Sequence, residues 1–259
     1  MAESTLSIKY DDLQIEVGVF VGYNVDVSKW TEAITDEVDR YIQAGVRQFY
    51  YPPAMDGVEA GYEWSFISPT TTLETTEDDV AQDMPDSFGR IVGDLHFESD
   101  VYAQSITVVS EHRIQALLQQ DDGTSRPRHA AIRFKDDDGT GQRQEIVWWP
   151  IPDAAYTLTY RYEAFAGKLL PTKYALGGMK HSELVVESCL AVAEQRANDE
   201  RGIHWELFGR LLVTAIAQDR KNGARHYGAM SAGESAGDDA LARGTQRTTS
   251  DITYRGNTW

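Results

Sequence analysis

The side chains best suited to metal binding or catalysis are scattered along this chain of 259 residues. Zinc and related metals are bound by imidazole and thiolate groups that recur at short, regular spacings. The six histidines occur singly and in unlike contexts, with no such spacing between them: His96, His112, His129, His181, His204 and His226. We therefore expect each histidine to be structural or to lie on the surface, and we predict no metal site and no cofactor.

Two acidic stretches have spacings that deserve a chemical test. In KDDDGTGQR, Asp136, Asp138, Thr140 and Gly141 match positions one, three, five and six of a calcium loop, but position twelve is Val147, where calcium loops place a bidentate glutamate. The cluster ETTEDD at residues 74–79 could hold the paired carboxylates of a glycosidase, although acidic loops in an acidic chain are mostly solvated. We expect neither calcium binding nor hydrolysis, and we predict that the protein is not an enzyme.

The overall charge restricts the class of partner. The chain has 24 Lys and Arg against 41 Asp and Glu, a formal net charge of −17. This charge argues against the open basic face with which nucleic-acid-binding proteins neutralise phosphates. The one cysteine, Cys189, excludes an intramolecular disulfide and fits a reduced, intracellular site of assembly. No apolar run approaches the length of a membrane span, and the first residues lack a leader pattern, so we expect no membrane anchor.

Helical periodicity occurs at both ends of the chain. Residues 29–50 carry apolar side chains at spacings of three and four and end before two prolines. Residues 181–200 and 205–223 show two further amphipathic helices, the second with basic residues in its last turn and a glycine just beyond. Residues 11–23 could form a helix ended by Gly18 or Gly22, or a strand, and the pattern does not decide between them.

The middle of the chain changes to a period of two, with threonine, valine and aromatic residues between turn signals. This pattern predicts strands, with one short helix at residues 111–120. The predicted strands are residues 89–99, 105–111, 129–135, 144–150 and 156–165. In the last of them Tyr156, Leu158, Tyr160 and Tyr162 share one face, so we expect the aromatic band at residues 146–165 to form the core of a sheet.

Together these segments predict an α+β fold in four parts. Residues 1–55 and 177–223 would supply the N-terminal helix and the C-terminal helix pair of one bundle, and residues 56–176 a β-rich domain inserted between them. Residues 224–259 are rich in Gly, Ser, Ala and Thr and lack apolar periodicity, so we expect an extended tail that docks on partner subunits. Its candidate anchors are Tyr227, Tyr254 and Trp259.

Several of these segments resemble the head-to-tail adaptor, or neck, proteins of tailed bacteriophages. The resemblance is carried by WSFISPTTTLETTEDDVAQDMPDSFGRIVGDLHF at residues 64–97, by RPRHAAIRF and IVWWPIPDAAYTLTYRY, and by GGMKHSELVVESCLAVAEQRANDE. It spans roughly residues 10–228, and none of its motifs is catalytic. Met84 stands where the family usually has Leu before Pro-Asp, a change that conserves volume.

The resemblance implies a structural protein of the virion neck, made in the host cytoplasm and assembled as a ring, commonly of twelve subunits, beneath the portal protein. Such a ring would link the portal to a downstream tail or nozzle protein and line the channel through which double-stranded DNA passes without specific binding. The acidic charge could keep DNA sliding freely, or could keep free subunits soluble, and the sequence does not separate these explanations. The alternative from another class is a β-rich virion protein that recognises a glycan or receptor.

Overall fold

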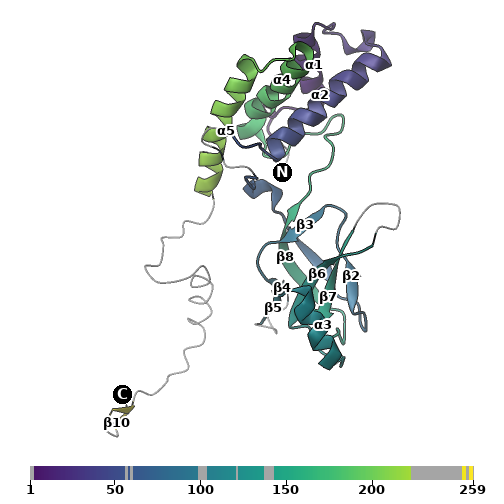
Figure 1. The fold of residues 1–259 in the computed structure, drawn as a ribbon, viewed down its shortest axis with the longest axis vertical. Coiled ribbons are helices and arrows are strands. Elements are labelled where there is room, and N and C mark those ends of the chain that lie inside the picture. Colours follow the sequence, from purple (N-terminus) through teal and green to yellow (C-terminus); the bar gives the residue numbers. More distant parts are fainter. Residues whose placement is uncertain are drawn as a thin grey trace. The chain divides into compact units, whose positions relative to one another are not determined.

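The computed structural model describes residues 3–55, 58, 61–98, 104–120, 122–136, 143–222, 253–254 and 257–258. Residues 1–220 form one compact unit, which combines helices at both ends of the sequence with a sheet between them (Figure 1). The predicted α+β class is therefore confirmed, with the N-terminal helices and the C-terminal helix pair sharing one core. None of the described helices has the length and apolar character needed to cross a membrane.

The N-terminal part of the helical core consists of α1 (Tyr10–Val21) and α2 (Glu32–Tyr50). The open choice for residues 11–23 is settled as a helix, which ends at Gly22 in the left-handed conformation that glycine adopts without a Cβ penalty. The Thr31 hydroxyl accepts the Ile34 N–H at the start of α2. The apolar face of α2 buries Val38, Ile42, Val46 and Phe49 completely or nearly so, as its periodicity predicts.

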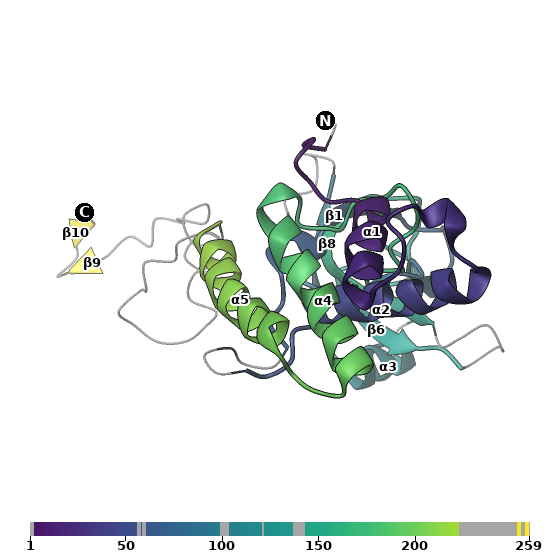
Figure 2. The same ribbon diagram turned by 90° about the horizontal axis from the view of Figure 1, so that it is seen from above.

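The C-terminal part consists of α4 (Ser182–Asn198) and α5 (Ile203–Asn222). Helix α4 packs on α2 at very close range. Gly45 allows this approach, because a Cβ added there would lie 2.5 Å from Cys189 Cα. The Ser188 hydroxyl donates to the Gly45 carbonyl at 2.8 Å across the same contact. Figure 2 shows α4 between α5 and α1 in the helical layer, an order that Figure 1 repeats.

The sheet contains eight strands among the described residues, in the order β1-β8-β4-β5-β6-β7-β2, with β3 also paired to β8. All neighbouring pairs are antiparallel except β5 and β6, which are parallel and joined through α3 (Glu111–Gln120). The strands are β1 (Thr70–Glu74), β2 (Ala81–Asp83), β3 (Phe88–Ile91), β4 (Leu95–Phe97), β5 (Ser105–Val108), β6 (His129–Phe134), β7 (Gln144–Trp149) and β8 (Thr157–Ala164).

One predicted strand is wrong, because the structure divides it into two strands. Residues 89–99 are divided between β3 and β4, because the chain turns at Gly93, whose φ of 86° suits a residue without a Cβ. The short strand β2 had not been predicted. Strand β1 was likewise absent from the period-two prediction, whereas β5 to β8 and α3 lie where the period-two and helical patterns placed them.

The aromatic band is core, as expected. Leu158, Tyr160 and Tyr162 of β8 alternate with more exposed neighbours and pack in one cluster with Trp148, which is fully buried. Trp149 points to the other side of the sheet, where its ring stacks on His129 with centroids 5.8 Å apart. A smaller cluster on that side joins Ile114 of α3 to Ala131 and Val147.

The segments that connect the sheet to the helices also pack into the helical core. Trp64 is 1% exposed and donates its indole N–H to the Phe49 carbonyl at 2.9 Å. Leu169 and Ala175, on the return segment, belong to the same cluster. Two 3-10 turns lie in these connections, η2 (Ser65–Ile67) before β1 and η3 (Met179–His181) before α4, and a further 3-10 turn among the described residues, η1 (Val27–Lys29), joins α1 to α2. The domain limits at residues 55/56, 176/177 and 223/224 stay a prediction.

Near the end of the chain, β9 (Thr253–Tyr254) pairs in antiparallel fashion with β10 (Asn257–Thr258). Residues 224–252, 255–256 and 259 of the predicted tail lie outside the described residues.

Candidate assembly surface

The five histidines within the described residues lie in separate places. Within the described ranges, no group of three or more His, Cys, Asp or Glu side chains could hold a metal ion. His181 is buried among aromatic rings, His129 stacks on Trp149, and His204 pairs with Glu187. His96 lies in β4 and His112 in α3, whereas His226 falls outside the described residues, as does most of the loop at 136–143.

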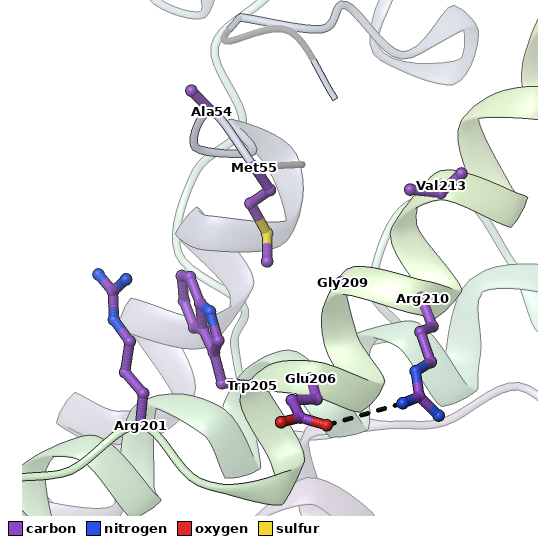
Figure 3. Close-up of a pocket in the computed structure, with 8 residues that line it drawn as sticks. All are labelled: Ala54, Met55, Arg201, Trp205, Glu206, Gly209, Arg210 and Val213. Carbon is purple, nitrogen blue, oxygen red and sulfur yellow. Dashed lines mark ion pairs between the residues drawn. The ribbon is translucent and has the colours of Figure 1, made fainter. Parts of the chain in front are cut away.

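The candidate site is instead a groove on the outer side of α5. It has a volume of about 510 Å³ and lies between α5 and the chain segment that follows α2 (Figure 3). Trp205, Gly209 and Val213 are four residues apart and therefore share one helix face. The groove is lined by Ala54, Met55, Arg201, Trp205, Glu206, Gly209, Arg210 and Val213.

Gly209 gives the groove its depth. A Cβ added at this position would lie 2.9 Å from the terminal methyl carbon of Met55, so the Met55 side chain lies directly over the glycine. Val213 is 41% exposed on the same face. Trp205, Met55 and Val213 thus border a small apolar floor that is open to the surface.

Arginine side chains border this apolar floor. The Arg201 guanidinium lies over the Trp205 ring, 4.2 Å from its centroid, in cation–π geometry. Arg210 forms an exposed ion pair with Glu206 one turn away, with 3.7 Å between the nitrogen and the oxygen (Figure 3). Two arginines and one glutamate give the rim a net positive charge, which contrasts with the strongly acidic chain as a whole.

Partly buried polar contacts hold the N-terminal end of α5 against α4. His204 Nδ1 lies 2.8 Å from a carboxylate oxygen of Glu187, and the His204 N–H donates to Glu194 at 3.2 Å. Phe20 of α1 packs edge-on against the His204 ring, with centroids 5.0 Å apart. The groove face of α5 is therefore held in a defined position before any partner arrives.

The C-terminal end of α5 is fixed by Asp219, which is only 4% exposed. Its carboxylate accepts the Tyr62 hydroxyl at 2.8 Å and both the backbone N–H and the hydroxyl of Ser65. Burial and the hydrogen bond to Asp219 raise the pKa of Tyr62 to about 12, so the phenol remains a donor at neutral pH. The Arg220 guanidinium lies over the Tyr62 ring, 5.5 Å from its centroid.

The comparison with known families decides the class of protein. Residues 8–243 match the family described as SU10 adaptor protein, which covers nearly the whole chain. The chain belongs to the SU10 adaptor family. It is therefore a phage head-tail adaptor, and the resemblance found in the sequence is confirmed. A search of the curated proteins finds no match.

Membership in the SU10 adaptors assigns the chain to a structural class of phage protein, so its functional sites are expected to be contact surfaces. The structure leaves the predicted docking residues untested. Tyr227 and Trp259 lie outside the described residues, and Tyr254 is placed through its backbone in β9, opposite Asn257. The α5 groove was not predicted from the sequence, where Trp205 and Val213 read as ordinary members of an amphipathic helix. The small Gly209 between them is the signal that could have indicated a hollow.

Proposed function

We propose that this SU10 adaptor forms a ring of twelve subunits beneath the portal protein in the neck of the virion, after synthesis in the host cytoplasm. The ring links the portal to a downstream tail or nozzle protein and surrounds the channel for double-stranded DNA. The observation that carries the proposal is the family match over residues 8–243, which supports an adaptor role for the helices, the sheet and the connections between them.

The charge of the protein fits passage of DNA without binding. Each Lys or Arg that contacts a phosphate releases counterions and adds affinity, which would retard a duplex moving through the ring. A chain with a net charge of −17 has few cations to spare for such contacts. The same charge also keeps free subunits apart before they reach the portal.

Electron microscopy of the purified protein mixed with its portal tests the proposal. We expect a closed ring on the portal, with a copy number that can be counted in class averages. The portal alone is the control. A protein that stays detached from the portal and binds immobilised glycans would contradict the adaptor proposal and support the recognition-module alternative.

The role of the charge is tested separately. Replacing exposed carboxylates that face the lumen of that ring by the corresponding amides should slow DNA ejection while leaving ring formation intact, because only the repulsion is reduced. If ejection is unchanged but the free subunits precipitate, the acidity serves solubility and not DNA passage.

A further inference from the structure

Helix α1 carries an apolar pair on its outer face that the described part of its own subunit leaves partly exposed. Ile15 is 36% exposed and Val19 is 45% exposed, and the spacing of four residues places them on one side of the helix. Apolar side chains at an i, i+4 spacing form the ridge with which one helix packs into the groove of another. This side of α1 is therefore suited to a helical partner.

The contact made by Phe20, the neighbour of Val19, shows which way the Ile15 and Val19 side chains point. Phe20 packs on His204 of its own α5. Successive residues are about 100° apart around an α-helix, which turns Val19 about 100° and Ile15 about 140° away from the side that faces α5. The exposed pair of α1 is thus directed away from α5, and α4 lies between the two helices (Figures 1 and 2).

The charges around the two surfaces are complementary. Asp12 and Glu16 are exposed and lie within about 60° of Val19 around α1, on the same outer side as the apolar pair. The α5 groove, in contrast, has an apolar floor and a rim of Arg201, Arg210 and Glu206 with a net positive charge. An acidic ridge with two aliphatic side chains complements a groove with an apolar floor and arginines at its edge in polarity and in the sign of its charge.

We propose that the α1 face of one subunit, formed by Ile15, Val19 and Glu16, docks into the α5 groove of the next copy of this chain. The contact joins two different surfaces of the same protein. It can therefore repeat from subunit to subunit, and in a closed ring every α1 face and every α5 groove is occupied. This inference rests on the proposed function, because it names the lateral contact of the proposed ring. The portal and the downstream tail protein are the other possible occupants of the groove, and the experiment distinguishes them.

Cysteine cross-linking on the portal-bound ring tests the contact. The native Cys189 is fully buried, and burial raises the pKa of its thiol to about 12, so it gives little background reaction. We expect the double variant Val19→Cys/Val213→Cys, treated with a short bis-maleimide, to yield a ladder of covalent oligomers of this chain. Val19→Cys/Val92→Cys is the matched control. Val92 lies on the β3–β4 turn and is 37% exposed, close to the 41% of Val213.

The outcomes separate the inference from the proposed function. A ring that is visible on the portal but gives no ladder, or no more than the control gives, overturns the inference and leaves the adaptor proposal standing. A product that joins Val213→Cys to the portal or to the tail protein also overturns it, because another partner then fills the groove. If the wild-type protein forms no ring on its portal, the inference falls together with the proposed function.

Charge reversal provides a second test that does not depend on cross-linking geometry. Glu16→Arg and Arg210→Glu should each weaken ring formation up to about fivefold per contact, the range for exposed ion pairs, and the double variant should recover part of that loss. Lys29→Glu, on an exposed residue of η1, is the control reversal. Ring occupancy on the portal is measured against protein concentration, with circular dichroism to verify folding. Losses that simply add in the double variant contradict the proposed pairing.

Discussion

Trp148 and Trp149 show how far one residue position changes the role of a side chain. Adjacent strand residues point to opposite faces, and the structure places Trp148 in the fully buried core and Trp149 in a half-buried stack on His129. We expect Trp148→Ala to lower the free energy of unfolding by about 3–5 kcal/mol, because it leaves a large cavity. Trp149→Ala should cost clearly less. Urea denaturation of both variants gives the comparison, and equal losses would contradict the assigned faces of β7.

His181 is a residue whose ionisation should change stability. It is 7% exposed and lies among Phe49, Trp64 and Phe66, and burial lowers the pKa of its imidazole, opposed in part by the nearby carboxylate of Asp219. The unfolded chain therefore binds a proton at a higher pH than the folded protein. The free energy of unfolding should consequently fall as the pH drops below about 6.5 and continue to fall until the pKa of the folded state is passed.

The variant His181→Phe tests this pH dependence. It keeps an aromatic ring in the cluster but cannot be protonated, so its free energy of unfolding should decline less than that of the wild type between about pH 7 and pH 5. Measurements near pH 8, where both side chains are neutral, provide the reference for any change in packing. Parallel pH profiles for the two proteins would show that His181 does not contribute.

At the scale of elements, the contact between α2 and α4 depends on one missing methyl group. A Cβ at Gly45 would lie 2.5 Å from the backbone of Cys189, which cannot move without separating the helices. We expect Gly45→Ala to destabilise the protein by about 1–3 kcal/mol. This loss outweighs the gain of about 1 kcal/mol that alanine brings in helix propensity.

Gly209→Ala is the matched control for that substitution. Its added Cβ would meet the flexible end of the Met55 side chain, which can turn aside. Thermal unfolding should therefore show a Tm that is unchanged or slightly raised, in contrast to Gly45→Ala. A similar loss of Tm at both positions would contradict the explanation that Gly45→Ala destabilises the protein through a clash with the rigid backbone of α4.

Most of these elements could be predicted from the sequence because each had one clear period. Helix α2 and strand β8 present a continuous apolar face, so pattern and burial agree. Helix α1 could not be decided, because its apolar residues lie on several sides: Leu13 and Val17 are buried, whereas Ile15 and Val19 are exposed. The division of β3 from β4 depends on a turn at Gly93, and β2 has three residues, too few for a period to be read.

The candidate site was less accessible to sequence reasoning than the fold. The groove exists because the segment around Met55 passes beside α5, and those two segments are about 150 residues apart in the sequence. Periodicity along α5 correctly indicates the buried Phe208, Leu212 and Ile216. It does not indicate what covers Trp205 and Val213, because that depends on a contact between distant parts of the chain.

At the scale of the whole molecule, the cores of the described unit are complete without the end of the chain. All the buried residues of the three apolar clusters lie between Tyr10 and Ile216. The last ten residues nevertheless include two large aromatic side chains, Tyr254 and Trp259, in a segment otherwise composed mainly of small and polar residues. Aromatic anchors commonly supply much of the energy of an interface. We therefore retain the prediction that this segment docks on a partner subunit.

Deletion of residues 250–259 tests that prediction. We expect the truncated protein to keep the Tm of the full chain, because no cluster of the described core loses a side chain, but to recruit the downstream tail component poorly to portal-bound rings. The double variant Tyr254→Ala/Trp259→Ala, which keeps the full length, should reproduce the defect if the aromatic side chains carry the contact. Tm is measured by calorimetry, and recruitment by counting completed necks in electron micrographs. Normal neck completion by both variants would refute docking through these residues, and a lowered Tm would show that the segment stabilises its own subunit instead.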